Sequence, residues 1–186
     1  MKAIRVAGSG GQGVQLAAVI LAEAAIRAGW HVACTQTYGP ESRGGASRAD
    51  VLISQDEIDY PKARELDVLV ALSAEGCERN VAALRTGGVL ICDRSVLQEP
   101  PAGVTTYALP IVDTAREIGG ALSANVVALG VVCAVTEVVS RENLGAALSA
   151  RIRSAISRNQ RALEAGLRLG AQVAPRRAQS AVGGPP

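Results

Sequence analysis

The N-terminal residues constrain the fold most, because an apolar segment, a glycine turn and a helical pattern follow one another there. Residues 3–7 form a short, mostly apolar run that is typical of a buried parallel strand. Gly8, Gly10 and Gly13 then fit the pattern G-x-G-x-x-G. From residue 14 to residue 26, apolar side chains recur at helical spacing. A strand, a tight turn and a helix in this order predict the first unit of an α/β fold.

This glycine turn (residues 8–13) can either bind an anion or serve close packing alone. Backbone N–H groups of such a turn can face a phosphate at a helix N-terminus. A dinucleotide site also places an acidic residue at the end of the second strand, but residues 35–37 are Thr-Gln-Thr. A free-standing NAD(P)-dependent enzyme is therefore the less favoured alternative. The candidate contacts are Gly8, Gly10, Gly11 and Gly13.

A second unusual stretch, the Tyr38 loop (residues 38–47), reads Tyr-Gly-Pro-Glu-Ser-Arg-Gly-Gly-Ala-Ser. Pro40 fixes its own φ, whereas the Gly44–Gly45 pair permits a sharp turn or a close approach. Arg43 can bind a carboxylate or phosphate through two parallel hydrogen bonds, or it can pair with Glu41. The loop is thus either a recognition surface or a tight loop with solvated charges. Its candidate contacts are Tyr38, Glu41, Arg43 and Gly44.

Together, the two stretches at this spacing resemble the gamma subunit, or gamma domain, of the 2-oxoacid:ferredoxin oxidoreductases. That family acts on pyruvate, 2-oxoglutarate, branched-chain 2-oxoacids, indolepyruvate or phenylglyoxylate. The resemblance covers roughly residues 3 to 165. Its matching segments are residues 8–14, 17–29, 37–45, 47–54 and 125–130.

The resemblance implies a complex of anaerobic metabolism that oxidatively decarboxylates a 2-oxoacid, usually to an acyl-CoA. Electrons pass to ferredoxin or another acceptor. The complex would use thiamine diphosphate, Mg²⁺ and [4Fe–4S] clusters, with coenzyme A as co-substrate. The implied partners are alpha and beta subunits that bind thiamine diphosphate, and a delta-type ferredoxin-like subunit. This chain would be a structural companion that can also line the coenzyme A side of the site; a purely structural subunit is the other alternative.

The chain itself has few candidate catalytic or metal-ligating residues. The single histidine, His31, lies at the start of a predicted strand and is interpreted as structural. No C-x-x-C pattern occurs, which excludes the usual iron–sulfur and zinc spacings. We therefore expect no catalytic residue, no metal and no cofactor bound by this chain alone, and an isolated chain that is inactive. The four cysteines, expected to be buried free thiols, are Cys34, Cys77, Cys92 and Cys133.

Further along the chain, predicted strands alternate with predicted helices. This order predicts a single Rossmann-like α/β domain over residues 1–170, with a mostly parallel sheet and helices on both faces. A helix is expected over about 74–85, followed by a strand at 89–92. An amphipathic C-terminal helix is expected at 151–169, and residues 171–186 are expected to be a disordered tail.

Four features follow predicted strands: the glycine turn, the Tyr38 loop, Ser73 and Asp93. Because ligands of open α/β sheets bind beyond the carboxyl ends of the strands, these features could converge on one edge.

The amino-acid composition limits the classes of molecule that the chain could bind. Aromatic residues make up only 2% of the chain, so the core must be aliphatic and stacking platforms for nucleic acid are missing. The net charge of +2 hides seven Arg and one Glu in residues 151–186, a cluster that could meet an acidic partner. No apolar leader and no run of 18 apolar residues is present, which predicts a cytoplasmic protein without a membrane segment.

Overall fold

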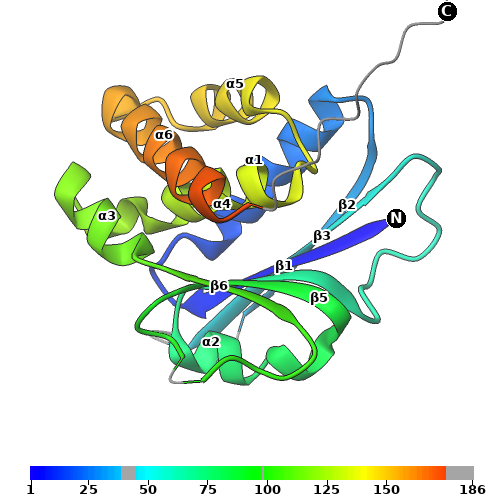
Figure 1. The fold of residues 1–186 in the computed structure, drawn as a ribbon. Helices are drawn as coiled ribbons and strands as arrows, with labels where there is room; N and C mark the ends of the chain where they lie inside the picture. The colour runs from blue at the N-terminus through cyan, green and yellow to red at the C-terminus, as the bar shows by residue number, and fades with distance from the viewer. Residues whose placement is uncertain (39–44, 98, 175–186) are drawn as a thin grey trace, which may run out of the picture.

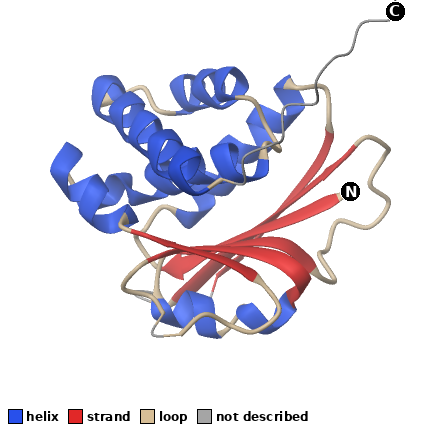
Figure 2. Ribbon diagram, in the orientation of Figure 1, coloured by secondary structure: helices blue, strands red, loops and turns tan. Residues whose placement is uncertain are grey.

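The computed structural model describes residues 1–38, 45–97 and 99–174. It has a twisted six-stranded sheet with helices on both faces, which confirms the predicted α/β class (Figures 1 and 2). The strands are β1 (Lys2–Ser9), β2 (His31–Tyr38), β3 (Ala46–Ser54), β4 (Leu66–Ala71), β5 (Leu84–Asp93) and β6 (Thr105–Leu109).

The helices cover the two faces unequally. Most of the helices pack above the sheet in Figure 1, whereas the short α2 lies below it. The upper core is aliphatic, as the composition predicts, and its side chains come mainly from β1, β3, α1 and α4. The helices are α1 (Val14–Arg27), α2 (Ala74–Glu78), α3 (Ile111–Ile118), α4 (Ala124–Thr136), α5 (Arg141–Arg151) and α6 (Ile156–Val173).

The strand order is β2-β3-β1-β4-β5-β6, and β3 alone runs against the others. Strands β1, β4, β5 and β6 pair in parallel, while β3 pairs antiparallel with both β2 and β1. The reversal follows from chain length, because the short connection between β2 and β3 can join only antiparallel strands. It also places the end of β2 at Tyr38 and the start of β3 at Ala46 at the carboxyl edge of the parallel strands.

The helix expected over 74–85 is wrong beyond its first turns. Helix α2 ends at Glu78, a short 3₁₀ turn spans Val81–Ala83, and β5 already begins at Leu84. Gly87 lies within β5 with a φ of 75°, and its N–H donates to the Gly103 carbonyl at 2.7 Å. The buried pairing of Leu84 with Leu66 extends the strand past the glycines.

The expected C-terminal helix is confirmed as α6, but its expected start at residue 151 is wrong, because the chain breaks between two helices there. Helix α5 ends at Arg151, and α6 begins after Ala155, whose φ is 51°. Residues 171–173, expected in the tail, belong to α6 because Gly170 packs that last turn against α4. The rest of the expected tail, residues 175–186, lies outside the described residues.

Helices α4 and α6 approach each other closely at glycines. A Cβ on Gly130 would lie 2.5 Å from the Leu163 carbonyl oxygen, and a Cβ on Gly166 would overlap the Val127 carbonyl oxygen. Only glycine permits such backbone contact between helices. The pair therefore forms a tight layer above the sheet.

Three of the four cysteines are buried, as expected, but Cys34 is exposed. The expectation failed for Cys34 because β2 is an edge strand, which pairs with a neighbouring strand on one side only in the described residues. None of the described helices is both long and apolar enough to cross a membrane.

Candidate functional site

The carboxyl edge of the sheet gathers most of the features singled out in the sequence. Strands β1, β4 and β5 end together there, so the glycine turn, Ser73 and Asp93 converge as expected. Strand β2 ends at Tyr38 at the same edge. The candidate contacts Glu41, Arg43 and Gly44 lie outside the described residues.

The glycine turn is held by the side chain of Gln12. Its Oε1 accepts a hydrogen bond from the Ser9 N–H at 2.7 Å, and its Nε2 donates to the Leu72 carbonyl at 2.9 Å. Gly8 leaves room for this arrangement, since a Cβ there would lie 2.5 Å from Gln12 Oε1. Gln12 thus ties the turn after β1 to the end of β4.

The far end of the turn is held by Asn125, in the first turn of α4. Its Nδ2 donates to the Gly13 carbonyl at 3.1 Å, and its side chain is 3% exposed. Gly13 is the N-cap of α1, with a φ of 72°. This contact brings the N-termini of α1 and α4 together and uses Gly13 for close packing.

The glycine turn also touches the start of β3, where the Tyr38 loop ends. The Gly10 N–H donates to the Gly45 carbonyl at 3.0 Å, and Gln15 Nε2 donates to Ser47 Oγ at 3.1 Å. The glycine turn and the start of α1 therefore contact Gly45 and Ser47, at the end of the Tyr38 loop.

The helix N-termini at this edge differ in how they are capped. Ser73 Oγ caps α2 by accepting from the Gly76 N–H at 3.0 Å, and Asp93 Oδ2 accepts from the Val112 N–H in the first turn of α3 at 2.7 Å. Among the described residues, no side chain caps α1. A helix N-terminus carries partial positive charge, so the surface beside Gly11, where a Cβ would meet nothing within 4 Å, is suited to an anion.

Asp93 is a structural residue, because its carboxylate is already hydrogen-bonded. Besides the Val112 N–H, it accepts from the N–H and hydroxyl of Ser95 at 3.0 and 2.5 Å. Burial alone would raise the pKa of Asp93, but these hydrogen bonds lower the pKa below its usual value.

A buried polar network that the sequence reasoning missed lies directly behind the glycine turn. Arg5 on β1 forms a two-point ion pair with Asp50 on β3, at 2.5 and 2.7 Å, and also donates to Asn80 Oδ1 at 3.1 Å. Asn80 Nδ2 donates to the Gly76 carbonyl at 2.8 Å, and Gly76 packs against the backbone of Gly8. The signal was present, since Arg5 stands alone inside an apolar run.

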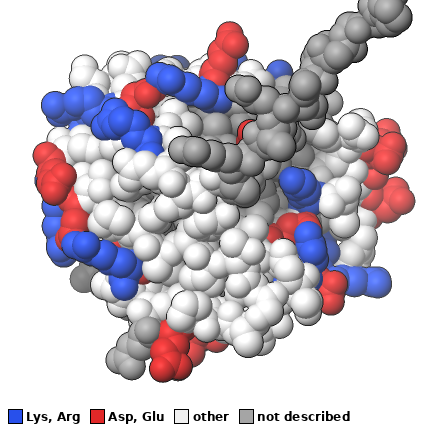
Figure 3. Space-filling view, in the orientation of Figure 1, with Lys and Arg blue, Asp and Glu red and all other residues white. Residues whose placement is uncertain are grey.

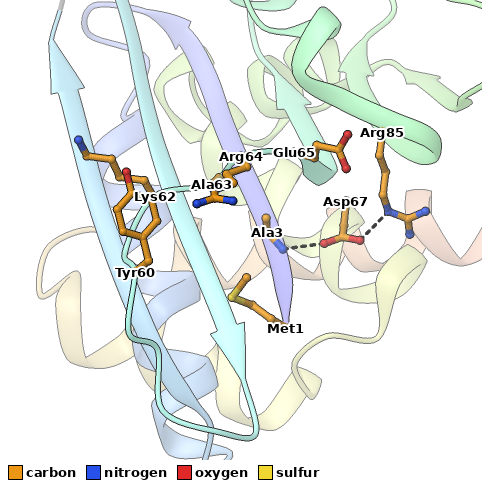
Figure 4. Close-up of a pocket in the computed structure, with 9 residues that line it drawn as sticks. All are labelled: Met1, Ala3, Tyr60, Lys62, Ala63, Arg64, Glu65, Asp67 and Arg85. Carbon is orange, nitrogen blue, oxygen red and sulfur yellow. Dashed lines mark hydrogen bonds and ion pairs between the residues drawn. The ribbon is translucent and has the colours of Figure 1, made fainter.

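Other surfaces of the molecule are arranged differently. On the face seen in Figure 3, acidic and basic side chains are intermixed around the rim and do not form a patch of one sign. A pocket of about 660 Å³ lies at the opposite, amino edge of the sheet (Figure 4). Within the described ranges, no three His, Cys, Asp or Glu side chains gather as a metal site requires.

Comparisons with known proteins agree on one family. The family model "Pyruvate ferredoxin/flavodoxin oxidoreductase" matches residues 3–169. The 2-oxoglutarate synthase subunit KorC of Methanothermobacter marburgensis is 43% identical over 148 residues, which is 75% of this chain and 80% of that protein.

Two solved structures share the fold. One is the gamma subunit of a keto/oxoacid ferredoxin oxidoreductase from Geobacter sulfurreducens PCA, with a TM-score of 0.83, 39% identity, and coverage of 92% of this chain and 99% of that one. The other is the 2-oxoglutarate:ferredoxin oxidoreductase from Magnetococcus marinus with 2-oxoglutarate, coenzyme A and succinyl-CoA bound. Its TM-score is 0.84 at 29% identity, over 92% of this chain and 31% of that chain.

Proposed function

The chain belongs to the pyruvate ferredoxin/flavodoxin oxidoreductase family, and we propose that its glycine turn and Tyr38 loop line the coenzyme A side of the active site. The chain is the gamma subunit of a 2-oxoacid:ferredoxin oxidoreductase. The observation that carries the proposal is the hydrogen bond from the Gly10 N–H to the Gly45 carbonyl, which ties the glycine turn to the end of the Tyr38 loop. The relative from Magnetococcus marinus binds coenzyme A, which makes an anionic co-substrate the natural candidate.

The chemistry proposed for this surface is binding and orientation. Coenzyme A carries several phosphate groups, and the N-terminal N–H groups of α1 have no side-chain cap in the described part of the chain. Backbone N–H groups and the helix dipole favour a phosphate at such a position. Arg43, in the Tyr38 loop, would add a charged contact. Gln12 and Asn125 keep the turn in place by their hydrogen bonds to both ends.

The described residues do not fit an iron–sulfur cluster, so no electron-transfer step is assigned to them. In the described part of the chain, no three His, Cys, Asp or Glu side chains gather as metal ligands, and burial raises the pKa of the Cys92 thiol to about 12 and that of the Cys133 thiol to about 11. Under the proposal, thiamine diphosphate, Mg²⁺ and [4Fe–4S] clusters are held by alpha, beta and delta-type subunits. Such a complex would act in the cytoplasm.

A purely structural role is the second candidate, and it is favoured by two of the glycines. Gly8 and Gly13 are explained by close packing against Gln12 and Asn125, without any ligand. Gly11 distinguishes the two candidates, because a Cβ there would meet nothing within 4 Å and its φ is 90°.

The test is steady-state kinetics of the complex reconstituted with Gly11→Ala. The added methyl group should obstruct the approach of a phosphate and raise the KM for coenzyme A about 10-fold, the effect of losing about 1.4 kcal/mol of binding. Gly29→Ala is a matched control, since Gly29 also has a positive φ of 83° and open space around it. Equal KM values for the two variants, with normal assembly, would favour the structural role.

A further inference from the structure

The pocket at the amino edge of the sheet lies across the molecule from the proposed coenzyme A surface. Residues 55–65, which connect β3 to β4, pass along this edge beside the first residues of β1, β4 and β5 (Figure 4). Ile58 and Ala63 anchor the connection, because both pack against the lower hydrophobic core. The connection that lines the pocket is therefore fixed to the core of the domain.

The floor of the pocket is held by Asp67, at the second position of β4. Its Oδ2 accepts from the Ala3 N–H at 2.8 Å, and its Oδ1 accepts from Arg85 Nε at 2.7 Å. These bonds join the starts of three strands. Because Asp67 and Arg85 form an ion pair, their opposite charges neutralise each other.

The other end of the pocket carries two cations without an acidic partner. The Arg64 guanidinium lies over the Tyr60 ring, 5.7 Å from its centroid, and Lys62 follows on the same segment. Neither cation forms an ion pair with any described residue. Glu65 lies at the opposite end, near Asp67 and Arg85 (Figure 4). A carboxylate would therefore be attracted to the Tyr60 end.

Tyr60 is 54% exposed, so its ring is accessible to a partner. Exposed Tyr and Arg beside a hollow are the residue types that dominate binding at protein interfaces. A small ligand would be largely enclosed by its site, whereas the lining residues Tyr60, Lys62 and Arg64 are all exposed. The pocket is therefore better suited to a polypeptide segment, because the rest of the partner subunit would shield that segment from solvent.

We propose that this pocket docks an acidic segment of a neighbouring subunit of the oxidoreductase. A carboxylate of that segment accepts hydrogen bonds from Arg64, Lys62 adds positive charge on the same segment, and an adjacent apolar side chain packs on Tyr60 and Ala63. The inference rests on the chain being a subunit of that complex. Under this proposal the amino edge of the sheet contacts a partner subunit, and the carboxyl edge binds coenzyme A.

The test measures association of the chain with its co-expressed partner subunits by biolayer interferometry at two salt concentrations. The double variant Lys62→Glu/Arg64→Glu should weaken association about tenfold or more, because like charges would face each other. Tyr60→Ala should weaken it with little salt dependence. Arg116→Glu/Arg141→Glu is the matched control, since it makes the same charge change at two exposed arginines outside the pocket, whose surface ion pairs with Asp113 and Glu164 contribute little.

Thermal unfolding of each variant should match that of the parent chain, because all substituted side chains are exposed.

Unchanged association of the Lys62→Glu/Arg64→Glu variant would overturn the docking proposal and leave the coenzyme A proposal standing. Equal weakening by the control variant would also overturn it, because general charge would then explain the effect. Competition by millimolar acetate alone would show a small-anion site in place of a docking site. If the parent chain associates with no partner subunit, both the docking proposal and its premise, that the chain is a subunit of the oxidoreductase, are overturned. A changed KM for coenzyme A with normal assembly concerns only the proposed coenzyme A surface at the carboxyl edge.

Discussion

The amide of Asn125 occupies the space into which a side chain on Gly13 would extend, although the two residues are 112 positions apart. Asn125 Nδ2 donates to the Gly13 carbonyl at 3.1 Å, and Gly13 has a φ of 72°. One contact therefore sets the start of α1 against the start of α4. The geometry of the glycine turn depends on this tertiary contact as well as on its own sequence.

Gly13→Ala should destabilise the chain by about 2–4 kcal/mol, since left-handed strain and overpacking against Asn125 act together. Gly29→Ala should cost only about 1–2 kcal/mol, because its positive φ is retained but nothing lies within 4 Å of the new Cβ. Urea unfolding of both variants measures the difference. Equal losses would contradict the packing role assigned to Asn125.

Gly166→Ala should destabilise the chain by about 2–3 kcal/mol, although alanine is the better helix former. Its Cβ would overlap the Val127 carbonyl oxygen on α4 and push the two helices apart. Gly145→Ala on α5 is the control, because no atom lies within 4 Å of that Cβ. The control should gain up to about 1 kcal/mol in chemical unfolding. If both variants gain stability, the close helix contact is not present in solution.

Asp50→Asn should cost about 3–5 kcal/mol, because it leaves Arg5 as a buried charge without its partner. Asp113→Asn removes the partner of Arg94 at an exposed site and should cost no more than about 1 kcal/mol. The double variant Arg5→Met/Asp50→Leu should recover much of the loss, since burying a well-packed apolar pair requires no charge compensation. Equilibrium unfolding at neutral pH tests all three, and a small effect of Asp50→Asn would show that water reaches Arg5.

Asp93 should make the stability of the chain depend on pH. Because hydrogen bonds lower its folded-state pKa below the value of 3.8, its contribution is present above that value and is lost as pH falls through the folded pKa. Asp93→Asn should therefore be less stable than the parent chain at pH 7, and the gap should close as the solution becomes acidic. Unfolding curves recorded between neutral and acidic pH measure that gap. A gap that stays constant with pH would show that the ionised carboxylate is not what stabilises the start of α3.

The local patterns of the chain determined the elements that form without long-range information. The strand, glycine turn and helix at residues 3–27 were predictable, because periodicity and turn residues act over a few positions. The near absence of aromatic residues likewise required an aliphatic core. The alternation of strands and helices was enough to predict an α/β fold, and the Tyr38 loop at its spacing was enough to indicate the family.

Only the tertiary structure decided how distant groups were paired. The start of β5 at Leu84 depends on pairing with Leu66, and Cys34 is exposed because β2 lies at the sheet edge. The ion pair between Arg5 and Asp50 likewise depends on which strands become neighbours. Such features arise when burial and hydrogen bonding are satisfied across the whole domain, whereas periodicity reports only on neighbours along the chain. For the same reason, the glycine turn and the Tyr38 loop could be found in the sequence, but only the folded chain brings Gly10 against Gly45.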